Sequence, residues 1–239
     1  MTHDKALMTK KYKCIFFDLD HTLWDYETNA TETLNELYVS FSLAERGVTS
    51  PEHFCKRFKE VNFQLWDLYD RGLITSEIIR KERFKQVLEP FGAHEEVFSE
   101  NLSKVYLNTC PHKSNLLPNA QETVQYLSGK YSLTIVTNGF EEIQPVKVAS
   151  GKLTPYFNHI ITSQRAGHKK PSREIFEYAM KLNSIEPHEA IMIGDNLLTD
   201  MAGARNATID TVFFNPEQTP HQDVVMHEIQ NLKELRSIL

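Results

Sequence analysis

The sequence contains few cysteines and no long apolar run. The three cysteines, Cys14, Cys55 and Cys110, are far apart and lack CxxC spacing, which argues against a disulfide framework and against a zinc site. No run of about 18 apolar residues, the length needed to cross a bilayer, is present. The charged opening MTHDKALMTKKYK also lacks the apolar stretch of a signal peptide. We therefore expect a cytoplasmic protein without a membrane partner.

An excess of positive charge is also absent. The net charge is −6, with 26 Lys and Arg residues against 32 Asp and Glu residues. A nucleic acid polymer is therefore not an expected partner, and an anionic ligand would have to be bound by a local site. Apolar residues make up 41% of the chain and charged residues 24%, which is typical of a folded globular protein.

Short apolar segments alternate with helical segments in the second half of the chain. YSLTIVTNG, FNHIITS, AIMIGD and IDTVFFN are rich in apolar and β-branched residues and end in turn residues, and CIFFD near the start is similar. Near-continuous apolar strands separated by helices predict an α/β fold with a parallel sheet covered on both faces. We assign residues 1–25 and 112–239 to this sheet core.

Residues 26–111 follow a helical pattern instead, in four segments bounded by Gly or Pro. In one of them, one buried stripe is predicted by the helical spacing of Phe54, Phe58, Val61, Leu65 and Leu68. This pattern predicts an inserted, all-helical cap domain over residues 26–111.

Three cap residues are candidates for contact with a substrate. Asn62 and Trp66 share a side of their helix with Tyr69, offset from the apolar stripe, and an aromatic ring there could stack on a nucleobase. Packing inside the cap is the alternative interpretation for the two aromatic rings. Arg83 could neutralise substrate charge, or it could belong to a solvated helix face.

Four polar segments, DLDHT, TNG, HKKPS and GDNLLTD, lie at or just beyond the ends of predicted strands. Ligands of open parallel sheets bind at the carboxyl ends of the strands, so we expect these segments to meet at one edge. Phosphoryl transfer needs a nucleophile, a proton donor, a divalent cation and donors for the phosphoryl oxygens. Each need has a candidate in the four segments.

The acidic candidates divide the chemistry between them. Asp18 is the candidate nucleophile, which would form an aspartyl phosphate, and Asp20 is the candidate general acid and later base. A Mg²⁺ ion that bridges Asp18 and Asp195 would also relieve the repulsion between neighbouring carboxylates. Asp200 would orient a metal-bound water from the first turn of the next helix, and Asn196 would stand with it behind the metal ligands.

The remaining candidates would bind phosphate. Thr137 and Asn138 offer a hydroxyl and a backbone N–H to phosphoryl oxygens, and Lys170 offers a full positive charge. Taken singly, each of these segments has a plain alternative: a strand-ending turn, a surface lysine or a helix cap. Their joint occurrence, in order and at strand ends, favours a site.

The series DxDxT, Thr-Asn, Lys-Pro and GDxxxxD resembles the four motifs of the haloacid dehalogenase superfamily, over about residues 13–215. The resemblance implies a Rossmann-like core with a helical C1-type cap inserted after the first motif, Mg²⁺ as cofactor and a covalent aspartyl intermediate. It also implies roles for single residues: Asp18 as nucleophile, Asp20 as acid and base whose backbone carbonyl ligates Mg²⁺, Thr137 and Lys170 as phosphate holders, and Asp195 as metal ligand.

Within that superfamily, Asp20 favours a phosphatase or phosphomutase, because the dehalogenase branch lacks the second aspartate. FFDLDHTLWDYETNA, NFQLWDLYDRGLIT and KPSREIFEYAMKLN resemble the pyrimidine 5′-nucleotidase subgroup. His21 departs from the pattern, since many relatives carry an acidic or small residue there.

The expected function is that of a Mg²⁺-dependent phosphomonoesterase acting on a small phosphorylated metabolite, with nucleoside 5′-monophosphates preferred. A sugar-phosphate phosphatase or a phosphomutase on the same scaffold is the alternative, followed by a non-catalytic binding protein. We expect a monomer or a weak homodimer.

Overall fold

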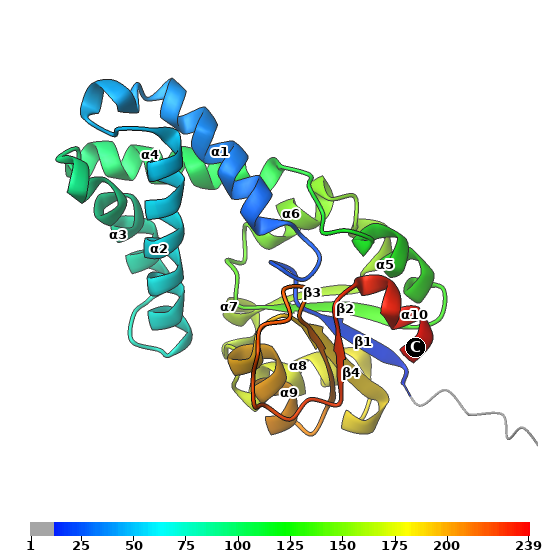
Figure 1. Cartoon of the computed structure of the whole chain (residues 1–239). Helices are drawn as coiled ribbons and strands as arrows, with labels where there is room; N and C mark the ends of the chain where they lie inside the picture. Colours follow the sequence, from blue (N-terminus) through cyan, green and yellow to red (C-terminus); the bar gives the residue numbers. More distant parts are fainter. Residues whose placement is uncertain (1–11) are drawn as a thin grey trace, which may run out of the picture. The chain divides into compact units, whose positions relative to one another are not determined.

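The computed structural model describes residues 12–239, so most of the MTHDKALMTKKYK stretch lies outside the described residues. The chain forms two compact units (Figure 1). The sheet unit comprises residues up to Leu23, Leu117–Asn138 and Leu153–Leu239, and the helical unit comprises Trp24–Leu116 and Gly139–Lys152. None of the helices in the described part of the chain combines the length and apolar character that crossing a membrane requires.

The sheet unit is built on a six-stranded sheet in which all neighbouring strands are parallel. The strands are β1 (Cys14–Phe17), β2 (Ser132–Thr137), β3 (His159–Thr162), β4 (Ala190–Gly194), β5 (Asp210–Phe214) and β6 (His227–Ile229), in the spatial order β3-β2-β1-β4-β5-β6. The predicted α/β fold is confirmed. Strand β6 was not predicted from the sequence, because it is a three-residue edge strand, HEI, with two polar side chains.

The register aligns the ends of the central strands. Phe17 of β1 pairs with Ile135 of β2 on one side and with Ile193 of β4 on the other. The positions that follow Phe17 and Ile193 therefore lie level with the last residues of β2. This is the carboxyl edge of the sheet, where ligands of such folds bind.

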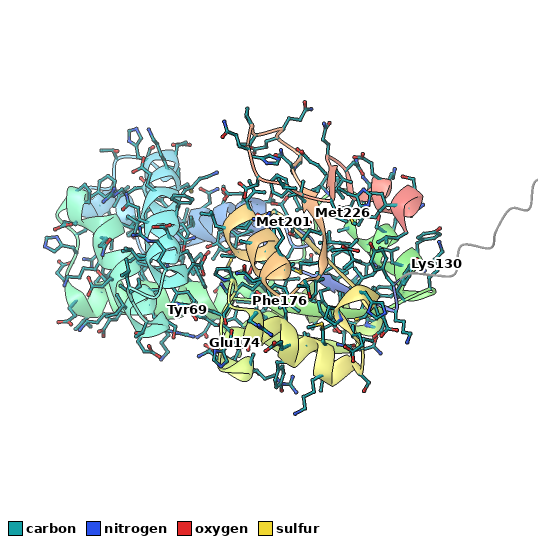
Figure 2. The ribbon with its side chains drawn as sticks, turned by 90° about the horizontal axis from the view of Figure 1, so that it is seen from below. Tyr69, Lys130, Glu174, Phe176, Met201 and Met226 are labelled. Carbon is teal, nitrogen blue, oxygen red and sulfur yellow. The ribbon has the colours of Figure 1, made fainter. Side chains whose placement is uncertain are left out.

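Helices cover both faces of the sheet (Figure 1). α8 (Arg173–Asn183) and α9 (Ala202–Asn206) lie on one face, and α5 (Ala120–Ser128) and α10 (Leu235–Ile238) lie on the other. Phe176 of α8 and Met201, which precedes α9, belong to one buried cluster with Phe16 and Met192 of the strands. Figure 2 labels Phe176 and Met201. All residues of β1 and β4 are buried and apolar or small. Since alternate strand residues face opposite layers, both faces of these strands are apolar. A short helix, α7 (Ser163–Ala166), follows β3.

The helical unit contains α1 (Tyr26–Ser40), α2 (Pro51–Asp70), α3 (Ser76–Leu88), α4 (Glu96–Thr109) and α6 (Gln144–Ser150). Ser50 caps α2 by accepting a hydrogen bond from the backbone N–H of His53, and Pro51 occupies the first helical position. The buried face of α2 includes Phe54, Phe58, Val61 and Leu65, as predicted, but Tyr69 is buried there and Leu68 only partly. Positions three and four residues after Leu65 both lie near that face, so spacing alone did not separate them.

The second segment of the helical unit was not expected. The sequence-based division placed the cap at residues 26–111 and left Gly139–Lys152 with the sheet core. In the structure this segment groups with the helices. It begins directly after Asn138, at the end of β2.

Candidate active site

Lys170 joins two buried carboxylates at the carboxyl edge of the sheet. Its Nζ donates hydrogen bonds to Oδ1 of Asp18 and to Oδ1 of Asp200, at 2.6 Å each, and to the backbone oxygen of Val136 at 2.9 Å. These three acceptors match the three donors of an ammonium group. Lys170 is only 2% exposed, so the alternative that it is a surface lysine is wrong.

The side chain of Asn138 holds the backbone of Lys170 in place. Its Oδ1 accepts a hydrogen bond from the Lys170 N–H at 2.8 Å, and its Nδ2 donates to the Lys170 carbonyl at 3.0 Å. The backbone carbonyl of Asn138 accepts from the Ser163 hydroxyl at 3.4 Å. Lys170 lies outside α8, because that helix begins three residues later, at Arg173. Its backbone is therefore held by the reciprocal hydrogen bonds with Asn138 and not by the helix.

A π-helical turn, Leu197–Met201, carries Asp200. Oδ2 of Asp200 accepts from the Asn196 N–H at 3.1 Å, and the side chain of Asn196 caps the turn by accepting from two backbone N–H groups. Asp200 lies in the first turn of the helical segment that follows β4, as predicted; this turn is π-helical and leads directly into α9. A β-carbon on Gly194 would lie 2.3 Å from Oδ2 of Asp200, so only glycine leaves room for this carboxylate. Gly194 was not predicted as a site residue.

Thr22 supports Asp195, which follows β4. Its hydroxyl donates to Oδ1 of Asp195 at 2.8 Å, and Thr22 is fully buried. The turn that carries it is closed by a hydrogen bond from the Leu23 N–H to the Leu19 carbonyl, and His21 adopts a left-handed conformation there (φ 62°). Thr22 was not predicted as a site residue. It is the threonine of DxDxT, and that motif was the signal from which it could have been found.

Three carboxylates converge at this edge. One oxygen each of Asp18, Asp195 and Asp200 lies within 4.8 Å of the others. Carboxylate oxygens are the ligands that Mg²⁺ prefers, so the donor set fits this ion. Both oxygens of Asp200 already accept hydrogen bonds, from Lys170 and from the Asn196 N–H. Asp18 and Asp195 are therefore the better placed metal ligands.

The cluster carries more negative than positive charge. Burial raises the pKa of Asp18 to about 7, although the Lys170 ammonium acts in the opposite direction. Burial also raises the pKa of Asp195 to about 6, and the neighbouring Asp18 adds to this shift. For Lys170, burial lowers the pKa, but Asp18 and Asp200 together outweigh it and the net shift is upward. A bound cation would relieve the repulsion among the carboxylates.

The other predicted residues of the sheet unit lie in the same region of the sheet. Thr137 is buried at the end of β2, and Asp20 is partly buried in the loop after β1. The structure thus brings the four polar segments together at the carboxyl ends of the strands, as expected. The individual chemical roles stay predictions.

The three candidate cap residues belong to the helical unit. Arg83 is 2% exposed, and its Nη1 donates to Oδ1 of Asn62 at 3.1 Å. Its guanidinium carbon lies 4.7 Å from the ring centroid of Tyr106, so the solvated-face alternative for Arg83 is wrong. Trp66 is partly buried and its ring packs against Tyr69 and Phe140. Substrate contact by these residues stays a prediction.

The chain is similar to several known proteins. The solved structure of the HAD-hydrolase YfnB from Bacillus subtilis, described as bound to magnesium, is 26% identical, with a TM-score of 0.86 over 96% of this chain and 99% of that one. The pyrimidine 5′-nucleotidase PynA of Streptococcus pneumoniae is 29% identical over 86% of this chain and 84% of its own. The glyceraldehyde 3-phosphate phosphatase of Pyrococcus furiosus is 27% identical over 95% and 93%. Residues 12–208 match the family model of the haloacid dehalogenase-like hydrolases, and the chain belongs to this family.

Proposed function

We propose that the protein is a Mg²⁺-dependent phosphomonoesterase that works through an aspartyl phosphate, with nucleoside 5′-monophosphates as its preferred substrates. The observation that supports this most strongly is the buried cluster in which Lys170 bonds Asp18 and Asp200 while Asp195 lies within reach. A buried, cation-paired carboxylate at the end of a central strand suits nucleophilic attack on phosphorus.

Asp18 would act as the nucleophile and Asp20 as the proton donor. A carboxylate oxygen of Asp18 forms a bond to phosphorus while the bond from phosphorus to the ester oxygen breaks, and Asp20 gives its proton to the departing alkoxide. Water then attacks the aspartyl phosphate and passes a proton to Asp20, which releases inorganic phosphate and restores Asp18. Lys170, 2.6 Å from Asp18, favours the ionised form that attack requires.

Phosphate binding would rest on Lys170 and on the end of β2. The Lys170 ammonium and the Thr137 hydroxyl, with the backbone N–H of Asn138, are the donors available at that edge. Asp200 and Asn196 act indirectly in this scheme: Asp200 holds the ammonium of Lys170, and Asn196 holds the turn that carries Asp200.

The side chains of Asp18 and Asp195, with the backbone carbonyl of Asp20, would hold Mg²⁺. When bound, this ion supplies positive charge that stabilises the phosphoryl group during transfer. The oxygen-only donor set and the raised carboxyl pKa values of Asp18 and Asp195 support this assignment.

The choice of nucleotides as substrates rests on the likeness to PynA, together with the subgroup resemblance of the sequence. The likeness to a glyceraldehyde 3-phosphate phosphatase favours small sugar phosphates as the second candidate class. Both classes share the phosphomonoester that the sheet unit would bind.

The proposal is tested by phosphate release from a panel of pyrimidine and purine 5′-monophosphates and small sugar phosphates, with Mg²⁺ or with EDTA. Asp18→Asn removes the proposed nucleophile. Asp223→Asn is a matched control, because Asp223 is a more exposed aspartate of the same unit that pairs with Arg205 at 3.2 Å.

The proposal is supported if phosphate is released from nucleotides and this release needs Mg²⁺. The release should also disappear in Asp18→Asn and persist in Asp223→Asn. Release from sugar phosphates alone keeps the mechanism and corrects the substrate class. Isomerisation of a sugar 1-phosphate without net release indicates a phosphomutase. Activity that is unchanged in Asp18→Asn belongs to a contaminant, and the non-catalytic alternative then gains.

A further inference from the structure

Phe140 is fixed by two helices of the helical unit. Its ring centroid lies 5.3 Å from that of Trp66 on α2, with the two rings tilted by 31°. The guanidinium carbon of Arg80 on α3 lies 3.9 Å from the same Phe140 centroid, within the range of a cation–π contact. Phe140 is 4% exposed, so almost all of its side chain is buried.

Arg80 also holds the chain two residues further on. Its Nη2 lies 2.5 Å from Oε1 of Glu142 in an ion pair, and its backbone carbonyl accepts a hydrogen bond from the Ser103 hydroxyl on α4. Arg80 thereby binds the segment 139–152 through both an aromatic ring and a carboxylate. We call Trp66, Arg80, Phe140 and Glu142 the clasp.

The clasp lies very close in sequence to the proposed phosphate-binding backbone. Thr137 and Asn138 belong to the sheet unit, and the helical unit resumes at Gly139. Directly after Gly139 the chain turns, because the Phe140 carbonyl accepts hydrogen bonds from the N–H groups of residues 143 and 144. The side chain of Gln144 fills the space beside Gly139, since a β-carbon there would lie 2.2 Å from its Nε2.

We propose that Phe140 is a positioning residue for the phosphate-binding backbone at residues 137–139, and that Trp66 belongs to the clasp and does not stack on a nucleobase. This inference rests on the proposed phosphatase function. With only Gly139 between Asn138 and Phe140, a displaced Phe140 moves the backbone donors at the end of β2. A misplacement of about 1 Å at a reacting group can cost about 100-fold in rate.

The helical unit contains a second arginine–phenylalanine–glutamate group that serves as a control. The guanidinium carbon of Arg46 lies 3.9 Å from the ring centroid of Phe98, and Arg46 pairs with Glu95 at 3.8 Å. This second group repeats the arginine–phenylalanine–glutamate contacts of the clasp, although Phe98 packs on Phe41 in place of a tryptophan and is only partly buried. No proposed site residue is adjacent to it in sequence. Phe98→Ala and Arg46→Ala are therefore the controls for Phe140→Ala and Arg80→Ala.

The experiment measures kcat and KM of the full chain with Mg²⁺ on a nucleoside 5′-monophosphate and on glycerol phosphate, which has no ring to stack. Phe140→Ala should lower kcat about tenfold or more, by the same factor on both substrates. Arg80→Ala should act in the same direction, and Phe140→Leu should recover part of kcat. Phe98→Ala and Arg46→Ala should stay within about twofold of the parent protein. Circular dichroism and thermal denaturation establish that each variant is folded.

Trp66→Ala separates the two interpretations of this residue. The clasp predicts a fall in kcat on both substrates. Stacking predicts a rise in KM for the nucleotide alone, and that result would overturn the assignment of Trp66.

If Phe140→Ala is unfolded, Arg80→Ala and Phe140→Leu decide the matter. If the clasp variants behave like the Phe98 and Arg46 variants while the parent protein is active, the inference is wrong and the proposed function stands. A parent protein that releases phosphate from neither substrate nor from the wider panel overturns the proposed function, and this inference with it.

Discussion

Oδ2 of Asp200 lies against the α-carbon of Gly194, so closely that a β-carbon on residue 194 would approach it to 2.3 Å. Gly194→Ala should therefore displace the carboxylate that accepts from Lys170, and it should lower the free energy of unfolding by about 1–3 kcal/mol, as overpacking does in a well-packed interior. Urea denaturation of the metal-free protein measures this change.

Gly129→Ala is the control for that substitution, because the nearest atom to its β-carbon would be a carbonyl oxygen at 3.6 Å, an ordinary contact. If the two variants have the same stability, the space beside Gly194 is not required by Asp200.

Lys170→Met should be more damaging, because it leaves Asp18 and Asp200 buried without a cation. Removing one partner from a buried ion pair costs about 3–5 kcal/mol. Lys81→Met is the contrasting variant: Lys81 pairs with Glu96 at the exposed surface at 2.9 Å, and solvent screening leaves such a pair little effect on stability. Urea denaturation near pH 8 compares them.

A second substitution checks that mechanism. Lys170→Met combined with Asp200→Asn should recover part of the lost stability, since one of the two uncompensated charges is gone. A double variant that is less stable than Lys170→Met would show that charge is not the cause.

Binding of Mg²⁺ should stabilise the protein more at high than at low pH. Burial raises the pKa of Asp18 to about 7 and that of Asp195 to about 6. A carboxyl group whose pKa is raised by folding costs stability when ionised, and this cost disappears as the pH falls through the folded-state pKa toward the ordinary value. Mg²⁺ needs the ionised groups, so the rise in Tm on adding Mg²⁺ should be larger near pH 8 than near pH 5. Differential scanning fluorimetry with Mg²⁺ or EDTA measures it.

Asp195→Asn is expected to abolish most of that rise. An equal rise at both pH values, or a full rise in the variant, would count against a magnesium site at Asp18 and Asp195.

Thiol labelling tests the packing of β1. Cys14 is fully buried in that strand and burial raises its pKa to about 11, and Cys110 is 3% exposed. Cys55 is the partly buried cysteine of α2, and its pKa is also raised by burial. Because the thiolate is the reactive form, alkylation of the native protein should be slow and confined to Cys55, and all three cysteines should react after denaturation. Rapid modification of Cys14, identified by mass spectrometry, would contradict the central position of β1.

The sheet and its site were accessible to sequence reasoning because strands and motifs carry local signals. Asp18, Thr137 and Asp195 each follow or end an apolar run, and the rule that parallel strands present their carboxyl ends together then places them in one region. Thr22 and Gly194 were missed because each acts on a partner that the local pattern does not reveal. The partner of Thr22 is Asp195, and that of Gly194 is Asp200, which the π-helical turn brings back beside it. The hydroxyl of Thr22 bonds a residue 173 positions away.

The helical unit was predicted less completely for a similar reason. Helical periodicity finds the buried face of α2, but it does not reveal that Asn62 turns inward to bond Arg83. It also cannot show that the segment after Asn138 packs with helices encoded 50 to 100 residues earlier, because ring contacts such as Trp66 with Phe140 leave no periodic trace.

The two-part composition of the helical unit affects how it could be exchanged between relatives. Residues 24–116 form a continuous insertion between β1 and β2, but residues 139–152 complete the unit from beyond β2. A chimaera that takes only the insertion would expose Trp66 and Arg80 where Phe140 normally covers them, unless the recipient supplies a compatible segment. The helical unit of such a chimaera should therefore pack as it does here only when both stretches are exchanged together.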